Sequence, residues 1–133
     1  MNWKKFEREI DLLYSKIDYR PDVVVGIGRG GVIPALLLAH RLDVKEMYFL
    51  TVRKEGDKRV VRTEITTPLE GRNILLVEDM LESGRSLIVA KEYLQGRGAN
   101  IRTAALYSTA DAEIIPDFYI RKLDAVVHFP WER

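Results

Sequence analysis

The amino-terminal segment carries an apolar stripe with the period of a helix. Trp3, Phe6, Ile10, Leu13 and Ile17 follow one another at steps of three and four residues. This spacing places the five side chains on one face of an amphipathic helix, with polar residues on the other face. The pattern therefore predicts a helix that opens the chain and packs one side against a core.

Further along, short continuous apolar runs alternate with helix-like segments. Runs of aliphatic and β-branched residues are typical of strands buried on both faces. We expect strands over residues 23–25, 47–52, 59–65, 74–77, 101–107 and 125–129, and helices over residues 34–42 and 85–95. The sequence EGD at residues 55–57 predicts a hairpin connection. Strands that alternate with helices predict an α/β fold, with a central parallel sheet flanked by helices on both faces.

Length and composition narrow the class of protein. With 133 residues, 47% of them hydrophobic, the chain predicts a single domain over residues 1–133. The 21 basic and 20 acidic residues nearly balance, which argues against a protein that coats nucleic acid. The longest apolar run, Val32–Ala39, falls far short of the roughly 20 residues of a membrane span. The absence of cysteine excludes disulfides and thiolate sites. We therefore expect a cytoplasmic protein that binds neither nucleic acid nor membranes.

The first of two loops with candidate chemistry is rich in glycine. It reads GIGRGG over residues 26–31, between a predicted strand and a predicted helix. Ligands of parallel α/β sheets bind at such loops, outside the carboxyl ends of the strands. The backbone amides and the following helix N-terminus favour anions, and Arg29 adds a donor for phosphate. A tight turn with an exposed arginine is the plain structural alternative.

The same glycines also fit a dinucleotide-binding loop. Gly26, Gly28 and Gly31 have the spacing G-x-G-x-x-G. That fold needs an acidic residue near the end of the next strand to hold the ribose. Here the next strand ends in Arg53 and Lys54, and these cations could hold the 2′-phosphate of NADP but not the ribose hydroxyls of NAD. A chain of 133 residues leaves little room for a full dinucleotide sheet and a substrate site.

The second loop favours a different ligand. Residues 74–87 read ILLVEDMLESGRSL, so four buried apolar residues lead directly into Glu78 and Asp79. Paired carboxylates at the end of a strand repel each other and are costly to desolvate, but they suit a diol or a hydrated divalent cation. Ser83, Gly84 and Ser86 follow at a helix N-terminus, where amides and hydroxyls hold a phosphate monoester. Together they indicate a ribose 5-phosphate site, with a capped helix and solvated acids as the structural alternative.

At this point the sequence resembles a known family. The second loop looks like the phosphoribosyl pyrophosphate (PRPP) motif of type I phosphoribosyltransferases, and the first looks like their pyrophosphate loop. The order of helix, strand, Arg-Gly-Gly loop, helix, hairpin and PRPP motif is similar to small purine enzymes of the hypoxanthine- and xanthine-guanine type. The ending FPWE at residues 129–132 resembles the hood that those enzymes place over the base. The resemblance implies Mg²⁺ as cofactor, PRPP and a nucleobase or nucleoside monophosphate as ligands, and a homodimer or higher homo-oligomer.

The resemblance also assigns roles to residues. Glu78 and Asp79 would hold the ribose hydroxyls and, indirectly, Mg²⁺, and would form the catalytic group with Glu82 and Arg29. The residues around the 5-phosphate would be Glu82, Ser83, Gly84, Arg85 and Ser86. The pyrophosphate would face Gly28, Arg29, Gly30 and Gly31. A small hairpin carrying Arg53 and Lys54 would close over the site as a lid.

The implied base pocket departs from the family pattern. It comprises Thr109, Val126, Val127, Trp131 and Glu132. Position 82 is Glu, where purine enzymes often carry Asp near a ring nitrogen of the base. Thr109 stands where enzymes for 6-oxopurines carry a lysine, and Val126 stands where similar sequences place a tryptophan. We therefore expect an intact sugar-phosphate half and weak use of hypoxanthine and guanine.

Two functional readings follow from this division of the site. The first is an enzyme that transfers ribose 5-phosphate from PRPP to a nucleobase, most simply a purine, with release of pyrophosphate. The second is a regulatory protein of the same fold that binds PRPP or a nucleotide without turnover. Release of pyrophosphate that depends on a base discriminates between them.

Overall fold

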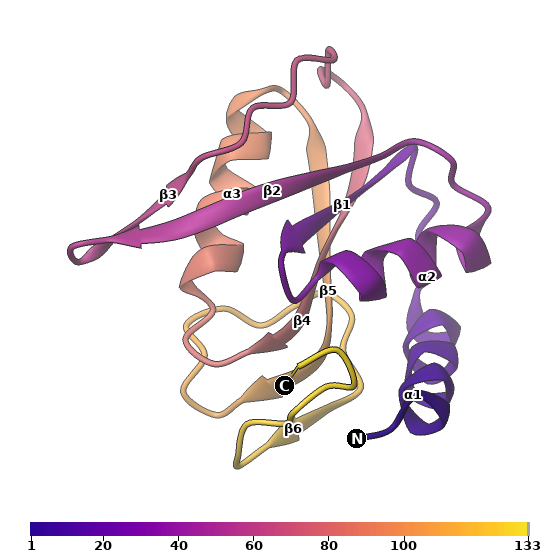
Figure 1. Ribbon diagram of the computed structural model, residues 1–133. Coiled ribbons are helices and arrows are strands. Elements are labelled where there is room, and N and C mark those ends of the chain that lie inside the picture. The colour runs from indigo at the N-terminus through magenta and orange to yellow at the C-terminus, as the bar shows by residue number, and fades with distance from the viewer. Residues whose placement is uncertain (133) are drawn as a thin grey trace.

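The fold is a single sheet with helices on both faces (Figure 1). The computed structural model describes residues 1–132. Along the chain the elements are α1 (Trp3–Lys16), β1 (Val23–Gly28), α2 (Val32–Leu42), β2 (Met47–Glu55), β3 (Lys58–Val61), β4 (Asn73–Leu81), α3 (Arg85–Gly96), β5 (Asn100–Thr109) and β6 (Arg121–Leu123). The six strands form one sheet in the order β3-β2-β1-β4-β5-β6. Neighbouring strands are parallel except for the antiparallel pair β2–β3, so the expected fold class is confirmed.

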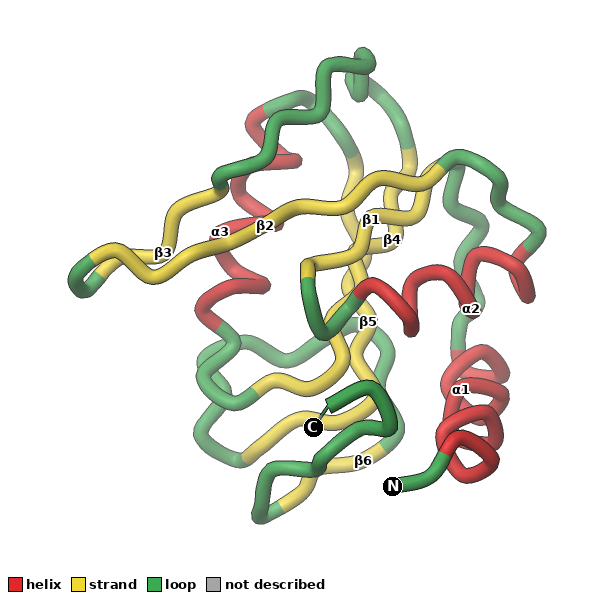
Figure 2. The backbone as a smooth tube through the Cα atoms, in the orientation of Figure 1, coloured by secondary structure: helices red, strands yellow, loops and turns green. Residues whose placement is uncertain are grey.

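Alternation along the strands builds two cores, one on each face of the sheet. On β1, Val24 packs with α1 and α2, whereas Val23 and Val25 pack with α3. Figure 2 shows the same division, with the two amino-terminal helices on one side and α3 on the other. Burial of both faces explains why β1 and β4 are continuous apolar runs rather than alternating ones.

The amino-terminal helix forms as its apolar spacing predicts. Phe6, Ile10 and Leu13 are fully buried against the sheet. The side chain of Asn2 accepts a hydrogen bond from the amide of Lys5 at 2.8 Å, which caps the first turn. The stripe is thus the packing face of α1, and its first residue, Trp3, stays half exposed at 50%.

The last predicted strand is wrong. Residues 125–129 lie outside any strand, and the sixth strand is instead the short β6, which pairs with Tyr107–Thr109 of β5. The apolar run has another purpose, because Phe129 turns inward and packs on Tyr107 and Phe6. The amide of Phe129 donates to the side chain of Glu132, so this segment forms a local turn and not the hydrogen bonds of a strand pair.

The hairpin of β2 and β3 extends away from the body of the sheet (Figure 1). Lys54 faces Arg59 in its register, and the turn lies at residues 56–57. The strand expected over residues 59–65 ends early, at Val61. Among the described residues, 1–132, no helix is both long enough and apolar enough to cross a membrane.

Candidate active site

A continuous cleft runs along the carboxyl ends of β1 and β4. Its larger part is a cavity of about 710 Å³, lined by the glycine-rich loop, the acidic end of β4 and the carboxy-terminal segment. Its smaller part is a cavity of about 400 Å³ at the start of α3. Glu78, Met80, Glu82 and Ser86 line both parts, so the two cavities join. This is where the topology of a parallel α/β sheet places its ligand.

The acid pair, Glu78 and Asp79, lies where β4 no longer pairs with β1. β1 pairs with β4 as far as Gly26 and Val77, while β5 continues alongside to Leu81. Glu78 and Asp79 therefore belong to the strand itself, which beyond Val77 pairs with β5 and no longer with β1. Met80 and Leu81 return to the core, which fixes the acid pair in a rigid element.

The two carboxylates are held in an unfavourable electrostatic setting. Burial and the neighbouring Asp79 carboxylate raise the pKa of Glu78 well above its ordinary value, and burial raises the pKa of Asp79. Within residues 1–132, none of the ion pairs involves either carboxylate. Local amides supply the partners, because the amide of Met80 donates to Asp79 at 2.6 Å. Two oxygen ligands that lack a cation fit Mg²⁺, which keeps waters and substrate oxygens for its remaining positions.

The glycine-rich loop comes into close contact with this pair. A Cβ atom built on Gly30 would overlap the carboxylate of Asp79, so only glycine lets the loop pass so near. Arg29 is exposed and lines the larger cavity, and the peptide bond between Gly28 and Arg29 is cis. The loop thus brings its backbone close to Asp79 and places Arg29 in the cavity that the two acids line.

The start of α3 forms a cup. Gly84 has φ of +78° and precedes the helix, and a Cβ there would lie 2.8 Å from the Ile114 side chain. No side chain caps this end of α3, although the hydroxyl of Ser83 accepts from the amide of Arg85 at 3.3 Å. Amides of the first turn of a helix lack partners within the helix and favour an anion. Ser86 lines both parts of the cleft, which joins the cup to the acid pair.

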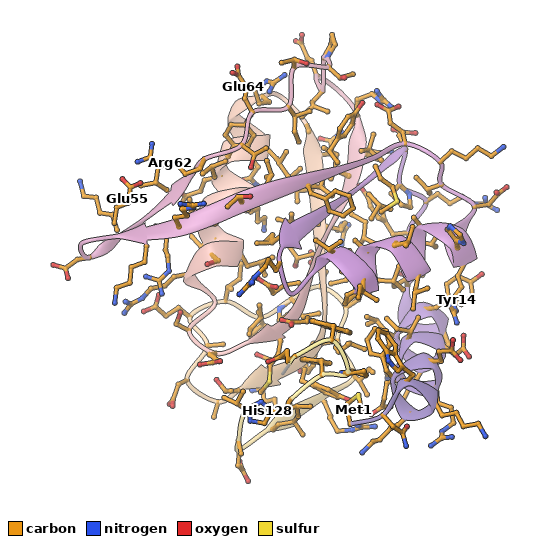
Figure 3. The ribbon with its side chains drawn as sticks, in the orientation of Figure 1. Met1, Tyr14, Glu55, Arg62, Glu64 and His128 are labelled. Carbon is orange, nitrogen blue, oxygen red and sulfur yellow. The ribbon has the colours of Figure 1, made fainter. Side chains whose placement is uncertain are left out.

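The opposite end of the cleft is apolar and aromatic. Trp131 lines the cavity and stacks on Phe129, with ring centroids 4.9 Å apart and planes 7° apart. Phe6 of α1 meets Trp131 edge to face at 5.0 Å, and Trp3 packs on it at 6.0 Å. The amino group of Met1 donates to the carbonyl of His128 at 3.2 Å (Figure 3). The wall is therefore braced from behind by the amino-terminal segment.

Most of the residues predicted from sequence come together. The larger cavity is lined by Gly28, Arg29, Gly30, Glu78, Asp79, Glu82, Ser86, Val126, Val127, Trp131 and Glu132, and the smaller one by Glu82, Ser83, Gly84, Arg85 and Ser86. Gly31, Arg53, Lys54 and Thr109 line neither cavity. Gly31 is buried at the start of α2, and Arg53 and Lys54 are exposed on β2. The hydroxyl of Thr109 donates to the carbonyl of Glu82 at 2.7 Å, so it contacts the backbone of the cup rather than the space for a base.

Several lining residues were missed. Met80 follows Glu78 by two positions on β4, so the period of a strand would have placed both on one side. Ile27 and Val52 add apolar surface to the larger cavity, together with Phe129 of the segment likened to the hood. Arg59 of the hairpin lines the cup at the start of α3. In the sequence, only its positive charge indicated a role in binding an anion.

These features define an α/β protein with one cleft that joins a glycine-rich loop, a pair of carboxylates and the start of a helix. The chain belongs to the phosphoribosyltransferases, because residues 2–132 match the family described as "Phosphoribosyl transferase domain". The resemblance seen in the sequence is thereby confirmed.

Named relatives agree with this assignment. The chain is 30% identical to a hypoxanthine-guanine phosphoribosyltransferase of Lactococcus lactis over 119 residues, which are 81% of this chain and 64% of that protein. It is 25% identical to a xanthine-guanine phosphoribosyltransferase of Cereibacter sphaeroides over 146 residues, covering 99% of this chain and 85% of that one. The crystal structure of a purine phosphoribosyltransferase from Pyrococcus horikoshii superposes with a TM-score of 0.92 at 31% identity, covering 100% of this chain and 92% of that one. The chain therefore spans less than two thirds of the first of these relatives and nearly all of the last.

Proposed function

We propose that this protein is a purine phosphoribosyltransferase, which transfers ribose 5-phosphate from PRPP to a purine nitrogen and releases pyrophosphate. The observation that carries the proposal is the continuity of the cleft. A phosphate cup, a diol-binding acid pair, a pyrophosphate loop and an aromatic wall follow one another along it. The named purine enzymes among its relatives support a purine as the acceptor.

The sugar-phosphate half of the site orients PRPP. Amides and hydroxyls of the cup from Ser83 to Ser86 bind the 5-phosphate, and Glu78 and Asp79 accept hydrogen bonds from the ribose hydroxyls. Cleavage of the bond to pyrophosphate develops positive charge on the sugar ring and negative charge on the leaving group. The acid pair lies on the sugar side and stabilises the first charge, while Arg29 and the loop amides stabilise the second.

Mg²⁺ belongs to this proposal as the cofactor held through Glu78 and Asp79. When bound, it supplies charge neutralisation for the pyrophosphate. As the base nitrogen bonds to the sugar carbon, its proton must leave. Glu82 lines both parts of the cleft and is exposed, so it is placed to accept that proton.

The base lies against the aromatic wall. Trp131 gives the flat apolar surface, with Phe129 stacked behind it and Val126 and Val127 beside it. Arg53 and Lys54 lie on the hairpin outside the cleft, so a role for them as a lid requires closure of the hairpin over PRPP. A homo-oligomer stays a prediction.

The test is release of pyrophosphate from PRPP in the presence of Mg²⁺ and one base at a time. The panel contains hypoxanthine, guanine, xanthine, adenine, uracil and orotate. The proposal expects release that depends on a purine and disappears on chelation of Mg²⁺. Saturable binding of PRPP without release on any base would instead support the regulatory reading.

A further inference from the structure

Arg59 reaches the phosphate cup from the hairpin, the element that the resemblance implies as a lid over the site. It lies on β3 of the hairpin, opposite Lys54 of β2. The residues it joins in the smaller cavity include Ser83, Gly84 and Ser86 at the start of α3. Lys54 is exposed and lines neither cavity, so of this cross-strand pair only Arg59 lines the cup.

The guanidinium of Arg59 has an unused donor. Its Nη1 atom is buried from water and has no hydrogen-bond partner among residues 1–132. A buried donor without a partner is costly, more so on a charged group. Such a cost is offset when an anion binds beside it.

Nearby guanidinium groups are engaged elsewhere. Arg62, on the same hairpin, is ion-paired with Glu55 (Figure 3). Arg85, at the first position of α3, lies 3.3 Å from the carboxylate of Glu113. Neither group has the same freedom as Arg59 to donate to a ligand in the cup.

We propose that Arg59 is a ligand of the 5-phosphate and completes the cup from the hairpin side. The planar fork of arginine matches two oxygens of a phosphate, and its charge is added to that of the helix terminus. The proposal rests on the proposed function, because it takes the occupant of the cup to be the 5-phosphate of PRPP or of a nucleoside monophosphate. It also gives the hairpin a contact with substrate that needs no closure, at the end of the cleft away from the pyrophosphate.

The test compares Arg59→Met with Arg62→Met, which removes the same charge from the same hairpin. Binding of GMP, guanosine and Mg²⁺-PRPP is measured by calorimetry at one ionic strength. We expect Arg59→Met to weaken GMP and PRPP alike, by about 10- to 100-fold, and to leave guanosine unchanged. Arg62→Met should change each of the three by less than about threefold. Arg59→Lys should recover part of the loss, since it restores the charge without the fork.

Other results overturn the assignment. A loss confined to PRPP would place Arg59 at the pyrophosphate, and unchanged binding of GMP would remove it from the site. Failure of the wild type to bind GMP or PRPP would reject the proposed function as well. If Arg59→Met does not fold, Arg59→Gln provides the same comparison. Inorganic phosphate supplies a second readout, because it should raise the melting temperature of the wild type and of Arg62→Met more than that of Arg59→Met.

Discussion

Glu78 and Asp79 show at the scale of single residues how a site opposes stability. Each carboxylate is desolvated beside the other, and neither has an ion-pair partner among the described residues. A protein selected only for stability would replace at least one of them with a neutral side chain. Their retention on a rigid strand is therefore best explained by the ligand that they serve.

Glu78→Gln and Asp79→Asn should each lower turnover by about 100-fold or more, because each removes a charged acceptor from the ribose. Relief of the mutual repulsion means that neither change should lower the melting temperature of the unliganded protein. Activity assays and thermal unfolding of the same samples check both statements. Full turnover in both variants would remove the diol assignment, and a large loss of melting temperature would attribute the defect to folding.

Val126 gives a prediction for the base end. It is 50% exposed and lines the cleft, so Val126→Trp would add a flat surface for a purine. Aromatic stacking adds about 0.5–1.5 kcal/mol, which is about 2- to 12-fold in catalytic efficiency on hypoxanthine or guanine. Ile115→Trp is the matched control, because Ile115 is 67% exposed and lies outside the cleft. No gain from Val126→Trp would show that the base does not lie against this position.

The sequence predicted that the residues of the second loop would lie together, because they are consecutive. A strand that runs into a loop and a helix places residues 78–86 by local geometry alone. Thr109 could not be placed in this way, because its orientation depends on a carbonyl 27 positions earlier in the chain. Arg59 was equally beyond reach, since only the packing of the hairpin against the start of α3 brings it to the cup.

At the scale of elements, an ion pair between the buried Glu9 and the half-exposed Arg121 ties the first helix to the far edge of the sheet. Glu9 of α1 is 7% exposed and accepts hydrogen bonds from Tyr107 of β5 at 2.6 Å and from Arg121 at the start of β6. Burial by itself raises the pKa of Glu9, but the hydrogen bonds from Arg121 and Tyr107 outweigh it, so the pKa is lowered. The helix and the short β6 are thereby fixed to the same strand.

The lowered pKa makes this contribution dependent on pH. The folded protein holds the proton of Glu9 less tightly than the unfolded chain, so the stabilisation is present above the unfolded pKa and is lost as pH falls through the folded pKa. Glu9→Gln should cost about 1–3 kcal/mol of unfolding free energy at pH 7. Urea titrations should show this difference shrinking in acid. Glu7→Gln, exposed on the same helix, is the control, and a difference that does not change with pH would contradict the assignment.

Elements were predictable from sequence where burial fixed their pattern. The apolar stripe of α1 and the runs of β1 and β4 pack as expected, because each has one stable way to bury its apolar side chains. Residues 125–129 were misread because an apolar run that covers an aromatic cluster has the same composition as a buried strand. The difference lies in tertiary contacts with α1, which no local pattern records.

For the whole molecule, ligand binding should be visible as a gain in stability. The cleft is lined by residues of β1, β4, α3 and the carboxy-terminal segment, so an occupant adds contacts between these elements. At 100 times its dissociation constant, GMP or Mg²⁺-PRPP should add about 2.7 kcal/mol and raise the melting temperature by roughly 10 °C. Ser86→Ala should reduce the shift. No shift at millimolar concentration would show that the cup does not bind phosphate.

The contacts of Met1, Trp3 and Phe6 with His128 and Trp131 also determine when the cleft is complete during folding. Residues 1–6 meet residues 128–131 across nearly the whole chain, whereas all the residues that line the phosphate cup except Arg59 lie between positions 78 and 87. Contacts between residues so far apart in the sequence form late in folding, because closing the intervening loop costs conformational entropy. The chain has two tryptophans, Trp3 and Trp131, and they pack on each other in this contact. Their intrinsic fluorescence therefore reports when residues 1–6 dock against residues 128–131 during refolding. The change in fluorescence should be slower than the change in circular dichroism that reports the helices.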